Sequence, residues 1–161
     1  MSRKMKRIRS IQSASCSDTE VSGIHLGLSL PEFLNEYTIR KFYYSEGEPK
    51  VKAEGPCFMV YTYYRCVSFK FNLMTMSLYQ IELTEGYTGN YMAKIRIGNL
   101  VGELRKLKYD FIIDRQAGKL RISPTLALDV SGNLSEVHSN SDVDSLRITG
   151  FRIGGLIAPD E

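Results

Sequence analysis

The sequence predicts an α+β fold, in which a curved antiparallel sheet of about six to seven strands packs against two amphipathic helices. A short motif repeats: Ile24-His25-Leu26-Gly27 and Ile95-Arg96-Ile97-Gly98 each precede a run typical of a helix. Long stretches alternate between apolar and polar residues, as half-buried strands do. With 161 residues and 43% hydrophobic side chains, the chain is long enough for one core. These observations predict two related Gly-helix-strand units sharing that core.

The first helix is predicted to begin at Ser29. Ser29 and Glu32 have the spacing of a capping box, and Pro31 is tolerated in a first turn, where its missing N–H has no helical partner. Apolar residues then follow at helical spacing, and the helix is expected to end near Arg40. They are Leu30, Phe33, Leu34 and Tyr37.

The second helix is predicted after the second copy of the motif. Asn99 is a suitable cap, and the apolar residues recur every three or four positions, which predicts one buried stripe. They are Leu100, Leu104, Leu107 and Phe111. Both helices are therefore expected to cover the sheet.

Period-two alternation predicts the strands. Segments 84–91 and 131–145 are polar and rich in turn residues, which predicts loops. In the last strand, 146–153, the apolar residues change parity at Gly150, as at a β-bulge. The alternating apolar residues are Val67, Phe69 and Phe71; Ile81 and Leu83; Ile95 and Ile97; Leu120 and Ile122; and Leu126, Leu128 and Val130.

The first 17 residues contain five basic and no acidic side chains, whereas the rest of the chain has 16 basic and 18 acidic ones, a net charge of −2. Residues 1–20 are predicted to be a disordered basic leader, and residues 21–161 a single domain. A targeting signal, an RNA-binding arm and plain disorder all remain open for the leader. No apolar run is long enough for a membrane span. The basic residues are Arg3, Lys4, Lys6, Arg7 and Arg9.

The three cysteines and two histidines do not have the spacing of a metal site. An odd number of cysteines without a CxxC motif favours a reducing compartment, so a cytoplasmic location is predicted. A bond between Cys57 and Cys66 across a hairpin stays open. No nucleophile elbow, phosphate-binding loop or zinc motif is present, so neither a catalytic activity nor a cofactor is predicted.

Two features indicate binding. Tyrosines cluster at Tyr61, Tyr63 and Tyr64, and tyrosine is enriched both at protein interfaces and on ordinary sheets. Cations fall at wet-side positions of the predicted strands, where they either form a basic face or simply keep the sheet soluble. The candidate cations are Lys70, Lys94, Arg96 and Arg121.

Residues 23–123 resemble small bacterial domains of the beta-lactamase-inhibitor-protein-like kind and the SmpA/OmlA outer-membrane assembly lipoproteins. The resemblance rests on the run from Ile24 to Phe33, the alternating run from Val67 to Phe71, and the second motif at Ile95. It implies an antiparallel sheet with short helices that binds proteins through its exposed face. Bacterial immunity proteins often have a similar shape. The chain lacks the apolar signal segment of the secreted members.

Together, these observations predict a non-enzymatic protein-binding module, most simply a bacterial immunity or inhibitor-type protein. Its partner is expected to be a toxin or enzyme with an acidic surface. The alternative is a nucleic-acid-associated or capsid-like assembly protein that uses the arm Arg3–Arg9 on phosphates. The sequence does not indicate the oligomeric state.

Overall fold

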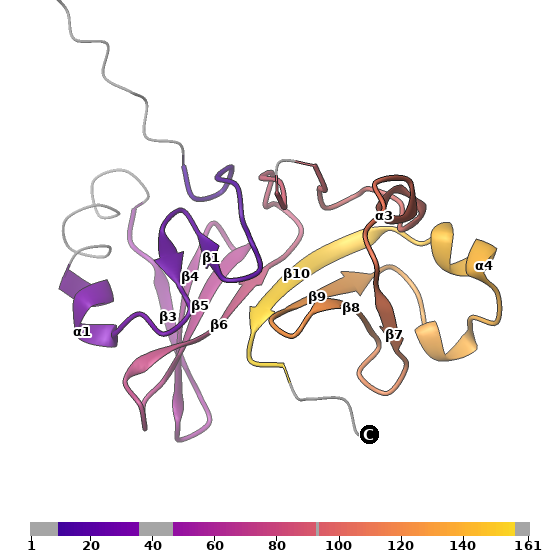
Figure 1. The fold of residues 1–161 in the computed structure, drawn as a ribbon. Helices are drawn as coiled ribbons and strands as arrows, with labels where there is room; N and C mark the ends of the chain where they lie inside the picture. The colour runs from indigo at the N-terminus through magenta and orange to yellow at the C-terminus, as the bar shows by residue number, and fades with distance from the viewer. Residues whose placement is uncertain (1–9, 36–46, 93, 157–161) are drawn as a thin grey trace, which may run out of the picture.

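A computed structural model describes residues 10–35, 47–92 and 94–156. Its main feature is an antiparallel sheet of eight strands with a few short helices, so the α+β prediction is confirmed at that level (Figure 1). The strand order is β3-β4-β5-β6-β10-β9-β8-β7. The strands are β3 (Lys50–Glu54), β4 (Phe58–Tyr63), β5 (Val67–Asn72), β6 (Ser77–Leu83), β7 (Ile112–Asp114), β8 (Lys119–Ser123), β9 (Leu126–Val130) and β10 (Ile148–Gly154). A separate ribbon pairs β1 (Glu20–Val21) with β2 (Ile24–His25).

The sheet consists of two four-stranded meanders that meet at their last strands. Strands β3 to β6 form the first meander, and β7 to β10 form the second. Strand β10 pairs antiparallel with β6, with Arg152 opposite Glu82. The connection thus makes one continuous sheet in which β3 and β7, the first strands of the two meanders, are the two edges (Figure 1).

The repeated sequence motif makes the same backbone hydrogen bonds in both halves. The Gly27 N–H donates to the Leu78 carbonyl, and the Gly98 N–H donates to the Ile148 carbonyl, at 2.9 and 2.7 Å. Likewise, Leu30 donates to Met76 and Val101 donates to Leu146, both at 2.8 Å. Each motif therefore ties the segment before its helix to the start of the last strand of its own meander. The sequence repeat has a structural counterpart.

The core lies on one face of the sheet, beneath the helices and the β1–β2 ribbon. Val67, Phe69 and Ile95 are fully buried, and Ile97 is half-buried against the same core. Phe33 and Leu104, from the two helices, belong to this single cluster. However, Ile95 forms only an isolated bridge with Tyr91, so the strand predicted at Ile95 and Ile97 is not formed.

The helices are shorter than the sequence predicts. The first, α1, spans Leu30–Phe33, and its Ser29 cap is present: the Glu32 N–H donates to Ser29 Oγ at 3.3 Å. Tyr37 and Arg40, which the prediction included, lie outside the described residues.

The second helix, α3, spans only Gly102–Lys106, and the predicted apolar stripe is wrong. Leu104 is buried, but Leu100 and Leu107 are exposed. Asn99 does not cap the helix; its Oδ1 instead accepts from the Arg96 N–H at 2.8 Å. The helix ends early because Lys108 adopts a left-handed conformation, with φ of 60°.

The packed part of the chain begins before residue 21, so the predicted domain boundary is too late. Ile11 and Cys16 are buried, and Cys16 forms isolated bridges with both Val21 and Tyr91. The apolar side chains among the polar residues of this segment fill the core next to the ribbon. Residues 1–9, and with them Arg3, Lys4, Lys6, Arg7 and Arg9, lie outside the described residues.

Segment 131–145 is not the plain loop that the sequence predicts. It contains a 3-10 turn, η2 (Leu134–Glu136), and a helix, α4 (Asn140–Asp144), whose side chains Leu134 and Val143 are buried. Short capped turns of this kind bury one apolar residue each and give no periodic signal. By contrast, the bulge predicted at Gly150 is confirmed by a register shift between Ile148 and Gly150.

Candidate functional site: the open face of the sheet

The face of the sheet opposite the core is polar, with mostly half-buried side chains that become exposed at β3, and we call it the open face. The helices and the β1–β2 ribbon lie on the other side (Figure 1). Along β5, the core residues alternate with half-buried residues that point to the open face. By strand register, the open face carries Lys50, Lys52, Glu54, Phe58, Val60, Thr62, Ser68, Lys70, Gln80, Glu82, Lys119, Arg121, Asp129 and Arg152.

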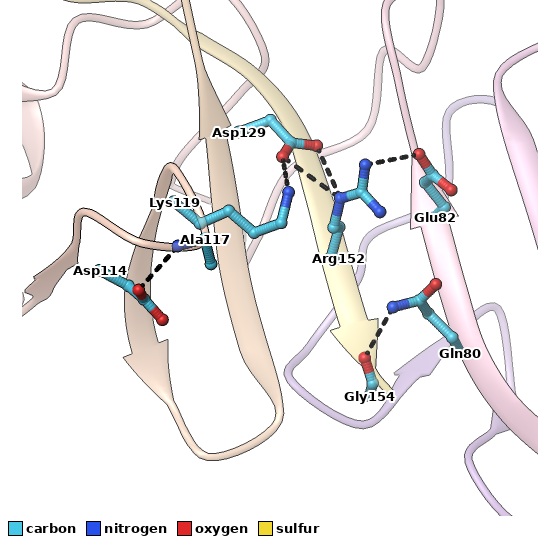
Figure 2. Close-up of polar contacts among 8 residues, drawn as sticks. All are labelled: Gln80, Glu82, Asp114, Ala117, Lys119, Asp129, Arg152 and Gly154. Carbon is cyan, nitrogen blue, oxygen red and sulfur yellow. Dashed lines mark hydrogen bonds and ion pairs between the residues drawn. The ribbon is translucent and has the colours of Figure 1, made fainter. Parts of the chain in front are cut away.

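A chain of ion pairs crosses the middle of the open face (Figure 2). Lys119 Nζ lies 2.7 Å from Asp129 Oδ1, and Asp129 Oδ2 lies 3.2 Å from Arg152 Nε. Arg152 Nη2 then reaches Glu82 Oε1 at 3.2 Å, so the chain joins β8, β9, β10 and β6. Because each of these cations already has an acidic partner, this part of the face carries little excess charge.

Arg121 is also compensated within the fold. Its Nε donates to Asp114 Oδ2 at 2.9 Å, and the two side chains are only 11% and 13% exposed. The Ala117 N–H donates to Asp114 Oδ1 at 2.9 Å, and this bond, together with Arg121, holds the pKa of Asp114 below its usual value. Arg121, a predicted partner-binding residue, thus closes the β7–β8 hairpin.

Lys70 is similarly engaged. Its ammonium lies 3.3 Å from Glu54 Oε2 and 4.6 Å from the centre of the Phe58 ring. Phe58 in turn packs against Tyr79, with ring centroids 5.2 Å apart. Since Tyr79 is exposed, this aromatic pair gives the open face an apolar area next to the charged rows.

At the β3 end, the open face has a hollow of about 430 Å³. Its lining includes three cations, Lys50, Lys52 and Arg65, and one acid, Glu54, which already pairs with Lys70. Within the described ranges, the three cations form no ion pair. We call this place the cationic hollow, because its positive charge is not compensated by the described part of the chain.

A strained turn places Arg65 at the cationic hollow. Tyr64 and Arg65 have φ values of 54° and 62°, and the Cys66 N–H donates to the Tyr63 carbonyl at 3.1 Å. Both central residues are left-handed, as a type I′ hairpin turn requires, although Asn and Gly are the residues that favour it. Two large side chains therefore occupy a turn that smaller residues adopt more easily.

The predicted tyrosines do not form one exposed surface. Tyr63 is 1% exposed and Tyr61 is buried, and their rings contact Phe69 and Phe33 in the core. Burial raises the pKa of Tyr61. Tyr64, in the strained turn, is 42% exposed. Only Tyr64 of the three is thus placed to meet a partner.

Lys94 and Arg96 do not belong to a strand of the sheet. Both are exposed on the connection between β6 and α3. Arg96 Nε donates to Asn90 Oδ1 at 2.5 Å. The sequence reasoning instead missed Lys50, Lys52 and Arg65. The sequence did contain a signal for the two lysines: residues 50–54 alternate between charged and apolar side chains, which places Lys50 and Lys52 on the same face of a strand.

A second hollow, of about 460 Å³, lies near the opposite edge of the sheet. Its lining is largely apolar, and it adjoins the exposed Ile112 on β7. The lining residues are Asp110, Phe111, Ile112, Arg121, Ile122, Ser123, Pro124 and Leu156.

The three cysteines are unbonded: Cys16 and Cys66 are buried and Cys57 is half-buried. Burial raises the pKa of the Cys16 thiol to about 11. Among the residues that the structure describes, no three His, Cys, Asp or Glu side chains gather as metal ligands. In the same ranges, no helix has the length and apolar character of a membrane span.

Comparison with known proteins shows the fold. No family model matches the sequence, and no curated protein matches it. Among solved structures, the chain is similar to the uncharacterized protein yfeY from Escherichia coli, with a TM-score of 0.55 and 11% identity. The similarity covers 87% of this chain and 99% of yfeY. It does not bear on the resemblance to the beta-lactamase-inhibitor-protein-like and SmpA/OmlA domains, which stays an expectation.

Proposed function

We propose that the chain is a non-enzymatic protein-binding module of the immunity or inhibitor type. It covers an acidic surface of a toxin or enzyme with the open face of its sheet. The observation that supports this proposal best is the cationic hollow: three cations that pair with no acid of the described ranges lie beside a face whose other charges are paired. Complementary charge of this kind guides association and selects the partner.

The rest of the open face suits docking because little of it has to reorganise. The ion pairs among Lys119, Asp129, Arg152 and Glu82 fix these side chains before a partner arrives. Side chains that are already ordered lose less entropy on binding. Phe58 and Tyr79 add an aromatic area to this face. Aromatic residues are enriched in the centre of protein interfaces.

A sheet of this breadth can cover a large part of the partner's surface. A stable interface covers about 800 Å² on each partner, and the eight strands form one folded sheet over which such a contact can extend. The odd number of cysteines without a CxxC motif favours a reducing compartment, and we propose a cytoplasmic location. The alternative, nucleic-acid binding through Arg3–Arg9, gains no support from the structure, because that arm lies outside the described residues.

Site-specific photo-crosslinking tests the proposal. A photoreactive amino acid replaces Tyr79 on the open face, and in a control protein it replaces the exposed Leu107 at the end of α3. In native lysate, the Tyr79 probe should give one protein adduct that excess unlabelled protein competes away and that high salt weakens. The Leu107 probe should not give it. Identical adducts from both positions would contradict the proposal, and a nucleic-acid adduct would support the alternative.

A further inference from the structure

We propose that β3 is a docking edge, along which an acidic, extended segment of the partner protein adds as a further strand. Its carboxylates lie over the cationic hollow and face Lys50, Lys52 and Arg65. This inference rests on the proposed function and specifies how the partner is held and by what chemistry.

Among the residues that the structure describes, β3 pairs with β4 alone, so the backbone on its other side has no described strand partner. All five of its residues pair with β4, from Lys50 opposite Thr62 to Glu54 opposite Phe58. Strand β3 is the end of the strand order, and all five residues are exposed. An edge strand of this length offers a row of N–H and C=O groups, to which an extended peptide bonds by β-augmentation.

The side chains of β3 specify the sequence of the added strand. Lys50 and Lys52 point to the open face and, being two residues apart on a strand, are separated by about 7 Å. Residues i and i+2 of an added strand have the same spacing. Val51, between them, is 51% exposed on the opposite face, where it favours an apolar neighbour. The expected segment therefore reads acidic, apolar, acidic.

The charges of the sheet select β3 over the other edge. Strand β7 has only three residues, and its neighbouring cation Arg121 is already paired with Asp114. Its exposed side chain, Ile112, is apolar and 67% exposed. At the β3 edge, an acidic segment can therefore pair with cations that have no acidic partner among the described residues. At the β7 edge, Arg121 is already paired with Asp114.

A synthetic probe tests the strand addition directly. The probe is a fluorescein-labelled octapeptide of alternating Glu and Val, and its binding to the full chain is measured by fluorescence anisotropy. The comparison peptide has the same sequence with alternate peptide nitrogens methylated, which keeps the charge and removes hydrogen-bond donors. The unmodified peptide should bind, more weakly at high salt, and methylation should weaken binding by about tenfold or more.

Matched charge reversals test the role of the lysines. The variant Lys50→Glu with Lys52→Glu should weaken peptide binding by about tenfold or more, because two attractive pairs become repulsive. The control, Lys106→Glu with Lys108→Glu, has the same net charge but changes exposed residues at the end of α3. It should alter the affinity by less than about twofold. Urea unfolding of both variants checks that they are folded.

Three outcomes would overturn the inference: no binding of the Glu-Val peptide, equal binding of the methylated peptide, or equal loss in both charge variants. These outcomes differ from a failure of the proposed function. If the partner still crosslinks to the Tyr79 probe when Lys50 and Lys52 are reversed, the open face binds the partner and only the strand addition is wrong. If the peptide binds β3 but Tyr79 captures no partner, the open-face proposal is wrong.

Discussion

At the scale of the residue, the clearest conflict between local preference and structure is the left-handed turn at Tyr64 and Arg65. A non-glycine residue in this region costs about 1 kcal/mol or more. In the proposed site, Arg65 supplies a charge at the cationic hollow. At this position, glycine would make the fold more stable, whereas arginine supplies the charge that the proposed binding site uses.

Replacing Arg65 with glycine separates these two effects. Arg65→Gly should raise the free energy of unfolding by about 1 kcal/mol, because glycine adopts positive φ without strain, and should weaken binding of the Glu-Val peptide. Urea unfolding and anisotropy measure the two quantities. Lys108→Gly is the matched control, since Lys108 has φ of 60° but lies after α3. It should stabilise the fold without changing peptide affinity; equal effects of both variants on affinity would exclude a role for Arg65.

Gly154, at the end of β10, cannot be replaced without damage. It has φ of +74°, and an added Cβ would lie 2.6 Å from Leu26 Cδ2 and 2.7 Å from the Tyr79 carbonyl oxygen. Gly154→Ala should lower the free energy of unfolding by about 3 kcal/mol, from strain plus overlap with backbone. Gly118→Ala has a similar φ of +69° but open space around it, so it should cost only about 1 kcal/mol. Equal losses in urea unfolding would contradict the packing argument.

The thiols should differ in reactivity. With a pKa of about 11 and a buried position, Cys16 has only about one thiolate in a thousand at pH 8. Iodoacetamide should therefore modify the half-buried Cys57 in the native protein, and Cys16 and Cys66 only after denaturation. Peptide mass spectrometry measures each site. Rapid native modification of Cys16 would show that the segment before β1 opens easily.

At the scale of the element, the β7–β8 hairpin should show a pH-dependent stability. The pKa of Asp114 is lowered by the Ala117 N–H and by Arg121, so its contribution is present above the usual pKa of aspartate. That contribution is lost as the pH falls through the lower pKa of the folded state. Asp114→Asn should therefore be less stable than the wild type at pH 7 and equally stable near pH 2.

Urea unfolding at a series of pH values measures this difference. Asp110→Asn, which removes an exposed carboxylate just before β7, is the control, and it should not reproduce the loss of stability at pH 7. A destabilisation of Asp114→Asn that persists unchanged to pH 2 would mean that the side chain acts through packing and not through its charge.

Elements with one buried face were predictable, and those without one were not. Strands β5 and β6 alternate clearly, and the sequence placed both. Strand β3 was missed because its alternation is short and weak: Val51 and Ala53 are its two apolar residues, and all five residues are exposed. The length of α3 depends on the backbone of Lys108, which local helical periodicity does not encode.

The candidate site was predicted only in its general nature. A charged sheet face was expected, but which cations are compensated depends on strand order. Arg152 lies between Glu82 and Asp129 only because β10 pairs with both β6 and β9. Pairing between strands so distant in the chain is not visible in local patterns. The burial of Tyr61 could have been predicted from the hairpin of β4 and β5, because in that hairpin Tyr61 lies opposite Phe69 and so on the same face.

At the scale of the whole molecule, the two meanders share one core and one sheet. Tyr91, after the first meander, has its ring 6.3 Å from that of Phe151 in the second. Splitting the chain would expose the apolar residues of β6 and β10 at a new sheet edge. The two halves are related by structure but not independent in folding.

We therefore expect fragments 1–92 and 93–161 to lack a folded structure when they are separate. Near-UV circular dichroism and amide NMR dispersion should show none in either fragment and should recover when the fragments are mixed. The intact chain should unfold in one transition, with the same midpoint by tyrosine fluorescence and far-UV circular dichroism. A fragment that melts cooperatively alone would show that its meander is an autonomous unit.

The arrangement of the two meanders also bears on stoichiometry. Strands β3 and β7 are equivalent in the two units and form opposite rims of one sheet. Had both rims kept the same side chains, every molecule would be divalent, and a partner with repeated acidic segments would be linked into chains. If the proposed docking at β3 is right, lysines on one rim and isoleucine on the other leave one docking edge per molecule, so we expect complexes of one copy with one partner.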